Sequence, residues 1–247
     1  MLLKSCLCGK LLSFVSIFCQ KMKKGKIDCN PDNCFLTKNC LKEWIPTILQ
    51  HKKTFKVKKG EIIFKEGDPV TGVFFVNAGN VKVHKRWDDD KELIIRFAKE
   101  GSILGHRGIG SDTHPVSATA LENGVVCYID KDFFEATLKV NSDFTYELLQ
   151  FFAEELRESE RKMRNLAHMP VKGRVAEALI SLKNQFGTTN SGFINIDLSR
   201  QDLASFAGAT YETVFRVINE LVHDKLIMLS GKSISIAGYD NLLKLTA

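Results

Sequence analysis

Residues 198–221, LSRQDLASFAGATYETVFRVINEL, constrain the fold of this chain more than any other stretch. Ser199 can cap a short helix, with Asp202 three positions later, and Gly208 then interrupts the pattern. Thr210 can cap a second helix, in which valine, isoleucine and leucine recur at three- and four-residue spacing. Two short helices joined at a glycine are typical of a helix-turn-helix, whose second helix reads DNA.

Glu212 and Arg216 stand one helical turn apart near the start of the second helix. A glutamate can accept a hydrogen bond from cytosine N4, and an arginine can donate two to guanine O6 and N7, so the pair suits adjacent G·C base pairs. The alternative is an ordinary i, i+4 ion pair on a solvated face, which contributes about 0.3 to 0.5 kcal/mol. The surrounding helix-turn-helix pattern favours the DNA-reading interpretation.

The pattern RQDLAxxxGxxxETVxRxIxxL over residues 200–221 resembles the DNA-binding signature of the Crp/Fnr family of bacterial transcription regulators. Residues 226–236 read as two short strands around a Ser-Gly-Lys turn, which predicts a wing. The resemblance implies a homodimer that binds a palindromic site in double-stranded DNA, with a TGA-like core in each half-site and RNA polymerase as a further partner. The residues expected to contact DNA are Arg200, Thr210, Tyr211, Glu212, Thr213, Phe215, Arg216 and Lys232. Tyr211 and Phe215 differ from the residues of the cyclic-AMP receptor and anaerobic-regulator branches, so the outer bases are not predicted.

Apolar and polar residues alternate between glycine turns from Phe55 to Asp130, which predicts a roll of two sheets built from short strands. The segments KGEIIFKEGD, FFVNAGNVKVH and GSILG resemble the cyclic-nucleotide-binding β-roll of the same family. The expected fold class is therefore α+β: an antiparallel β-roll of jelly-roll type, a long dimerisation helix and a C-terminal winged helix-turn-helix.

The nucleotide pocket of this roll is expected to be degenerate. In members that bind cyclic AMP, a glutamate takes the ribose hydroxyl and an arginine takes the phosphate, and His106 and Val116 stand at those positions here. A valine cannot pair with a phosphate, and burying an unpaired phosphate is costly, so cyclic AMP is not an expected ligand. The spacing of His106 and His114 is not diagnostic of a metal site, and a loop or core role is favoured for both.

A long helical stretch is expected from about Ser142 to His168. Its apolar positions alternate three and four apart, as in the seam of a two-stranded coiled coil, although an intramolecular core stripe gives a similar pattern. Dense charges leave only a narrow apolar seam, which favours a partner helix. The resemblance implies that the partner is a second copy of the chain. The seam residues are Leu149, Phe152, Leu156, Ser159, Met163 and Leu166.

The chain is expected to have five parts and to act in the cytoplasm. They are a basic N-terminal extension (1–28), a cysteine-rich sensor segment (29–43), the β-roll (44–135), the dimerisation helix (136–169) and the DNA-binding domain (170–247). Residues 1–28 hold six lysines and one aspartate, so most of the net charge of +6 lies outside the DNA-binding domain and is weak evidence for DNA binding.

The apolar run 11–19 is too short to span a membrane and lacks a small-residue cleavage site. Met22 is an alternative start, which would make residues 1–21 a non-native extension. No phosphate-binding glycine loop or nucleophile elbow indicates an enzyme.

Seven cysteines lie at positions 6, 8, 19, 29, 34, 40 and 127. Three fall in the short segment CNPDNCFLTKNC, residues 29–40, and one in a predicted strand. Thiolates are typical ligands of zinc and of iron–sulfur clusters. Three interpretations stay open: an iron–sulfur cluster, thiols that are oxidised or have no ligand role, and a zinc site, which the long gap before Cys127 disfavours.

The stretch GIGSDTHPVSATALENGVVCYI, residues 108–129, resembles the oxygen-sensing branch of the family. The resemblance implies a [4Fe-4S] cluster held by Cys29, Cys34, Cys40 and Cys127, which oxygen or nitric oxide would destroy. The spacing from Cys34 to Cys40 matches that branch, whereas the gap between Cys29 and Cys34 is longer. The alternatives to a cluster as the controlling signal are another small ligand and thiol oxidation. The alternative to DNA binding is a protein-interaction module that does not bind DNA.

Overall fold

The computed structural model describes residues 23–24, 33–88 and 91–246, which fall into two compact units. The first unit contains the chain up to Val81 and Ala98–Glu147, and the second contains Lys82–Phe97 and the chain from Leu148 onward. None of the described helices is long and apolar enough to cross a membrane.

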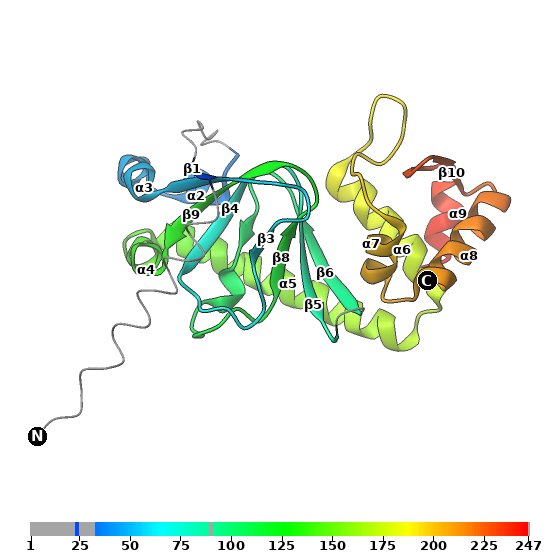
Figure 1. Ribbon diagram of the computed structural model, residues 1–247, viewed down its shortest axis with the longest axis horizontal. Helices are drawn as coiled ribbons and strands as arrows, with labels where there is room; N and C mark the ends of the chain where they lie inside the picture. Colours follow the sequence, from blue (N-terminus) through cyan, green and yellow to red (C-terminus); the bar gives the residue numbers. More distant parts are fainter. Residues whose placement is uncertain (1–22, 25–32, 89–90, 247) are drawn as a thin grey trace, which may run out of the picture. The chain divides into compact units, whose positions relative to one another are not determined.

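The helices, labelled in Figure 1, are α2 (Phe35–Asn39), α3 (Ile45–His51), α4 (Lys131–Val140), α5 (Ser142–His168), α6 (Val171–Phe186), α7 (Arg200–Ala207), α8 (Tyr211–His223) and α9 (Tyr239–Lys244), with short 3-10 turns at Lys42–Trp44 and His106–Gly108. The strands are β1 (Lys23–Lys24), β2 (Lys53–Val57), β3 (Ile62–Phe64), β4 (Gly72–Ala78), β5 (Val81–Arg86), β6 (Glu92–Ala98), β7 (Ile103–Leu104), β8 (Ser117–Ala120), β9 (Gly124–Asp130), β10 (Ile227–Ser230) and β11 (Ser233–Ile236).

The first unit is built on an antiparallel sheet with the strand order β1-β2-β9-β4-β7. Strand β9 is central, and Cys127 on it pairs with Thr54 of β2 and with Phe75 of β4. Strands β3 and β8 pair with each other. Gly72 opens β4 where a Cβ atom would lie 2.2 Å from the carbonyl oxygen of Ile129, so the close approach of β4 to β9 requires glycine.

The hydrophobic core of the first unit is rich in phenylalanine. Phe134 of α4 and Phe144 of α5 meet edge to face at 6.0 Å between ring centroids, and Phe35 of α2 packs on Phe144 at 5.9 Å. Such pairs contribute about 0.5 to 1.5 kcal/mol beyond the burial of their area. These contacts attach the short helix α2, and with it Cys34 and Cys40 at its two ends, to the helices that follow the roll.

The second unit contains the β5–β6 hairpin, the greater part of α5, and the helices α6 to α9 with the wing β10–β11. Buried valine, isoleucine and leucine side chains of α8 face buried residues of α6 and α7, and each such side chain stabilises the fold by roughly 1.5 to 3 kcal/mol. The expected fold class, with its antiparallel roll, long helix and winged helix-turn-helix, is confirmed.

One expected strand is absent from the described part of the second unit. The short run FINI, residues 193–196, follows a polar loop in the sequence and predicts a strand. The structure forms only a single bridge there, between Ile194 and Thr188. The chain between them turns back on itself, with the amide of Thr189 donating to the carbonyl of Phe193 at 2.8 Å. Ile194 also donates to the carbonyl of Ile234 at 2.9 Å, so it joins the wing without continuing as a ladder. Local alternation predicted a strand, and the tight turn removed the partner that a strand needs.

Candidate nucleic-acid interface

The helix-turn-helix consists of α7 and α8, and each of these helices begins at a hydroxyl side chain. The Ser199 hydroxyl accepts a hydrogen bond from the Asp202 amide at 3.0 Å, and the Thr210 hydroxyl accepts one from the Thr213 amide at 3.3 Å. Both bonds satisfy amides that have no partner within their helix. Gly208 ends α7 at φ 63°, and a Cβ there would lie 2.3 Å from a leucine side chain of α5. The predicted caps and the glycine turn are confirmed.

Arg174 of α6 holds this turn in place. Its guanidinium donates to the carbonyl oxygens of Met169 at 2.9 Å, Ala207 at 2.9 Å and Gly208 at 3.1 Å. The last two carbonyls lie at the end of α7, where unpaired oxygens and the helix dipole favour a cation. Arg174 therefore fixes the start of α8 against α6. No pattern in the sequence marks Arg174 for this role, because it is one arginine among other polar residues of an amphipathic helix.

The face of α8 that points away from the buried helices carries the predicted DNA-reading pair. Glu212 and Arg216 are both exposed. No ion pair joins them among the residues that the structure describes, so the i, i+4 pair considered as an alternative is not formed. Their carboxylate and guanidinium are available to a ligand. The buried residues on the opposite face are Val214, Val217, Ile218 and Leu221.

The remaining predicted contacts on α8 surround this pair. Thr210 and Thr213 lie in its first turn, and their hydroxyls are 3.0 Å apart. Tyr211 and Phe215 are exposed, and their rings stack with 6.2 Å between centroids and 16° between planes. Thr210 thus helps to begin the helix, whereas the two aromatic rings lie on its surface.

The last two predicted contacts, Arg200 at the start of α7 and Lys232 between the wing strands, meet at the turn of the wing. Arg200 donates to the carbonyl oxygens of Lys232 at 3.0 Å and of Gly231 at 3.3 Å. Partial burial lowers the pKa of Arg200, yet an arginine stays charged at neutral pH. The side chain of Lys232 is exposed at the tip of the turn. Arg200 therefore positions the wing, and Lys232 is the cation that it presents.

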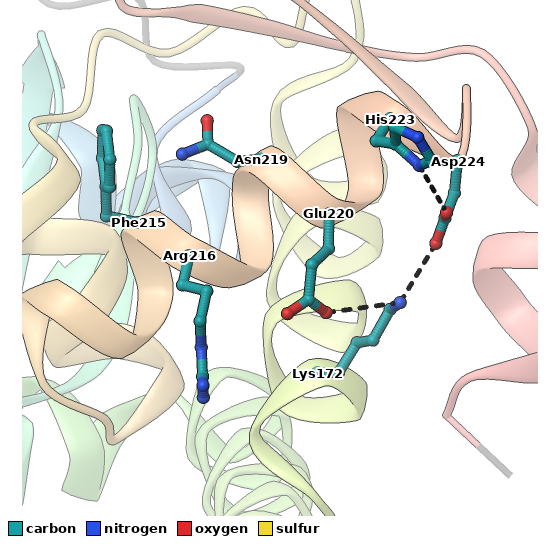
Figure 2. Close-up of a pocket in the computed structure, with 7 residues that line it drawn as sticks. All are labelled: Lys172, Phe215, Arg216, Asn219, Glu220, His223 and Asp224. Carbon is teal, nitrogen blue, oxygen red and sulfur yellow. Dashed lines mark hydrogen bonds and ion pairs between the residues drawn. The ribbon is translucent and has the colours of Figure 1, made fainter.

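A shallow depression of about 510 Å³ lies beside Arg216, between α8 and the first turn of α6 (Figure 2). The Lys172 ammonium contacts Asp224 at 3.1 Å and Glu220 at 3.5 Å. The hydrogen bond to Asp224 raises the pKa of Lys172. Exposed ion pairs of this kind contribute little to stability, at most about 1 kcal/mol. Figure 2 shows Phe215 and Arg216 leaving α8 in different directions, and neither is joined to another residue drawn there.

An ion network ties the β5–β6 hairpin to the first helix of the motif. Lys82 pairs with Asp202 at 2.8 Å and with Glu92, and His84 lies 3.1 Å from Glu92. Burial alone would raise the pKa of Glu92, but the hydrogen bonds from His84 and Lys82 outweigh it and lower that pKa to about 2. Asp202 therefore stabilises the start of α7 and also anchors the hairpin, which sequence reasoning could not detect across 120 residues.

Comparison with known proteins agrees with this architecture. The model of the cyclic nucleotide-binding domain matches residues 54–141, and the model of the Crp-like helix-turn-helix domain matches residues 173–245. The anaerobic regulatory protein of Bacillus subtilis is 31% identical over 185 residues, which cover 72% of this chain and 78% of that protein. The transcriptional activator protein anr of Pseudomonas aeruginosa is 30% identical over 188 residues, which cover 75% and 77%. The chain belongs to the Crp/Fnr family.

Membership of the Crp/Fnr family makes this chain a DNA-binding transcription regulator and not an enzyme. The solved structure of FixK2 from Bradyrhizobium japonicum has a TM-score of 0.72 at 25% identity and covers 79% of this chain and 98% of its own. The CRP-like cAMP-activated global transcriptional regulator of Mycobacterium tuberculosis is 28% identical over 190 residues, which cover 75% and 84%. Relatives of nearly equal similarity thus carry names that point to different signals, so identity alone does not assign the effector.

The predicted dimer seam of this Crp/Fnr protein is exposed along α5. The exposed fractions are 63% for Leu149, 60% for Leu156, 65% for Met163 and 41% for Leu166. Phe152 and Ser159, the other two predicted seam residues, are half-buried. A row of large apolar side chains at heptad spacing is costly to expose to water and suits a second helix.

The structure brings together two of the four predicted cluster ligands. Cys34 and Cys40 flank α2 and are buried, and burial raises the pKa of Cys40 to about 12, with the neighbouring Cys34 contributing in the same direction. Cys127 is buried on β9, where its Sγ atom lies 4.0 Å from the Thr54 hydroxyl. Across residues 33–88 and 91–246, no three His, Cys, Asp or Glu side chains gather to hold a metal ion. Cys29 lies outside the described residues, as do Cys6, Cys8 and Cys19.

The two residues predicted to replace the nucleotide-binding glutamate and arginine lie in the core. His106 and Val116 are both buried, in agreement with a core role for the histidine. His114 is also buried and stacks on Phe64 with 4.1 Å between ring centroids. Burial lowers the pKa of His114 to about 4, against the opposing effect of Asp68, so its ring is neutral at pH 7.

Proposed function

We propose that this regulator binds a palindromic site in double-stranded DNA as a homodimer, with Glu212 and Arg216 reading base edges in each half-site. The observation that carries the proposal is the exposure of both side chains on one face of α8, with no ion pair between them among the described residues. Arg216 suits guanine O6 and N7, and Glu212 suits cytosine N4, which agrees with a TGA-like core. Thr210, Tyr211, Thr213 and Phe215 would lie along the same groove. Lys232 would contact a phosphate, and Arg200 would hold the wing that presents it.

Alanine variants of the reading pair test this role. We expect Glu212→Ala and Arg216→Ala each to lose about 1 to 3 kcal/mol of discrimination at particular base pairs in a footprint. Arg86→Ala is a matched control, because Arg86 is an exposed arginine on β5 and outside the helix-turn-helix. Unchanged footprints in both variants would refute the DNA-reading role and favour a helix-turn-helix that contacts protein only.

The exposed seam from Leu149 to Leu166 supports homodimerisation through α5. Two parallel copies of the helix would place the two α8 helices in successive major grooves, about one turn of DNA apart. In this proposal residues 170–247 bind DNA, 136–169 dimerise, 44–135 form the sensor roll, and 29–43 form a cysteine segment that follows the basic extension 1–28. RNA polymerase is the further partner.

For the signal, we propose control by oxygen or redox state through a [4Fe-4S] cluster held by Cys29, Cys34, Cys40 and Cys127. The supporting observations are the two neighbouring buried thiols at the ends of α2 and the anaerobic regulatory protein among the relatives. The described thiols fit the cluster only in part, since Cys127 does not group with the other two. A cluster would supply oxygen-sensitive iron–sulfur chemistry, and it can favour the DNA-binding state only by stabilising that state more than the other.

Iron and acid-labile sulfide in protein purified without oxygen test the signal. About four of each per chain are expected, with visible absorbance that bleaches in air. Cys40→Ser should lose both, whereas Cys19→Ser should keep them. Iron-free protein that dimerises and binds DNA would refute the cluster. Thiol titration before and after oxidation would then test a redox pair, zinc analysis would test a zinc site, and calorimetry with candidate effectors would test a small ligand.

Cyclic AMP is not part of the proposal. A buried valine at position 116 offers no charge to a phosphate, and the buried His106 replaces the ribose-binding carboxylate. We expect DNA affinity, measured by fluorescence anisotropy, to be unchanged by millimolar cyclic AMP. A saturable increase in affinity would contradict this expectation.

A further inference from the structure

Two aromatic side chains on α8 are left largely outside the core. Tyr211 is 42% exposed and Phe215 is 50% exposed, although the two rings stack on each other. Four other apolar residues of α8 already form its buried face, so the fold gains little from this pair. Exposed aromatic groups beside polar residues are typical of interaction surfaces.

The position of Phe215 relative to Arg216 determines what it can reach. Successive residues of an α-helix project about 100° apart, so the two side chains flank the same outward surface of α8. Figure 2 shows them leaving the helix in different directions. When Arg216 reaches a guanine in the major groove, Phe215 therefore lies over a neighbouring base pair and not over the same one.

The chemistry of the ring limits what it can recognise there. A phenyl ring has no hydrogen-bonding atom, and the base edges of the major groove are polar except for the C5-methyl group of thymine. We propose that Phe215 selects thymine beside the base pair read by Arg216, by packing its ring on the thymine methyl group. Tyr211 is a positioning residue in this contact, because its stacked ring holds that of Phe215.

This inference rests on the proposed DNA-reading role of α8 and assigns a base that the Glu212–Arg216 pair leaves open. Among neighbouring base pairs, it predicts a preference for T over C that depends on a methyl group. It also predicts that the preference belongs to one side chain, since the carboxylate of Glu212 and the guanidinium of Arg216 recognise polar atoms.

The experiment removes the methyl group and nothing else. The probe is a duplex selected from a random-sequence pool by the wild-type full-length protein. Each thymine in the half-site is replaced in turn by deoxyuridine, and affinity is measured by fluorescence anisotropy at fixed salt. At one thymine position beside the core, removal of the methyl group should weaken DNA binding by the wild-type protein. The expected loss is about fourfold in affinity for each methyl group removed, because burial of one methyl-sized group contributes about 0.8 kcal/mol.

Variants of the aromatic pair assign that loss to Phe215. Phe215→Ala should bind the thymine duplex more weakly and show no further loss with deoxyuridine, whereas Phe215→Leu should keep part of the effect. Tyr211→Ala should reduce the effect, and Tyr211→Phe should keep it. Because Phe215 is half exposed, Phe215→Ala should retain the melting temperature of wild type, which separates lost contact from lost fold.

Three different failures are distinguishable. If wild type selects a specific site but shows no methyl dependence, or if Phe215→Ala keeps the full effect, the thymine contact is wrong while DNA reading stands. If Phe215→Ala changes no DNA affinity at all, the aromatic pair serves a contact with protein, which also overturns the inference. If the protein selects no site, the proposed DNA-reading role fails together with it.

Discussion

Arg174 should be the residue whose removal most disturbs the helix-turn-helix without touching its DNA-facing surface. Arg174→Met keeps most of the apolar length of the side chain but removes three hydrogen bonds, to the carbonyls of Met169, Ala207 and Gly208. A hydrogen bond to a charged group contributes about 1.5 to 3 kcal/mol when buried. Since Arg174 is only half-buried and water can reach part of the site, about 1 kcal/mol per bond is the appropriate scale. The expected loss is therefore about 3 kcal/mol of stability.

Urea unfolding followed by circular dichroism measures that loss, and amide hydrogen exchange localises it. Exchange should accelerate in α7 and α8, because the turn between them loses its anchor. Arg174→Lys, which cannot reproduce the three-way contact, should lose about 2 kcal/mol. The control is Arg157→Met, since Arg157 is exposed on α5 and pairs with the neighbouring exposed Glu154. A loss below about 1 kcal/mol in Arg174→Met, or a loss equal to that of the control, would refute the reasoning.

Three further perturbations follow from the described contacts. Leu156→Glu places a charge in the seam, at a residue that is 60% exposed in one copy of the chain, and should weaken the dimer at least about 100-fold by analytical ultracentrifugation. Val140→Glu, on the exposed surface of α4, should not weaken it. Equal effects of the two substitutions would exclude the seam as the dimer interface. Folding lowers the pKa of Glu92 from 4.5 to about 2, so above pH 4.5 its carboxylate is ionised in both the folded and the unfolded state. Glu92→Gln should therefore reduce stability above pH 4.5, and the difference from wild type should shrink as the pH falls toward 2. A pH-independent deficit in urea unfolding would contradict this linkage. Gly208→Val should lower the melting temperature more than Gly110→Val. Both glycines have φ above +60°, but only at position 208 would the added Cβ lie close to a neighbouring side-chain atom, 2.3 Å from a leucine carbon of α5. Equal losses in the two variants would leave backbone strain as the only cause.

Much of the DNA-binding domain was predictable because its determinants are local. The caps at Ser199 and Thr210, the turn at Gly208 and the wing strands all depend on residues within a few positions of one another. Hydrogen-bonding side chains at helix starts and a glycine at φ 63° leave few alternatives to the backbone. The incorrect strand at 193–196 marks the limit of such reasoning, because an alternating pattern does not reveal whether a partner strand is present.

The parts of the site that could not be predicted depend on residues far apart in the sequence. Arg174 contacts carbonyls 33 and 34 residues away, and Lys82 contacts Asp202 across 120 residues. Arg200, expected to touch DNA, donates to two carbonyls of the wing turn, at which the side chain of Lys232 is exposed. None of these partners is marked by spacing or composition.

The sequence by itself predicted the fold class and the helix proposed to read DNA, because periodicity, caps and the resemblance of residues 200–221 to the Crp/Fnr signature are properties of short segments. Tertiary structure decided which polar groups are already engaged and which remain available. Glu212, Arg216, Phe215 and Lys232 are left facing outward, while Arg174, Arg200 and Asp202 are engaged in holding the domain together. The physical reason is that a charged side chain satisfies its hydrogen bonds with whatever the fold brings within about 3 Å, and only the folded chain sets those neighbours.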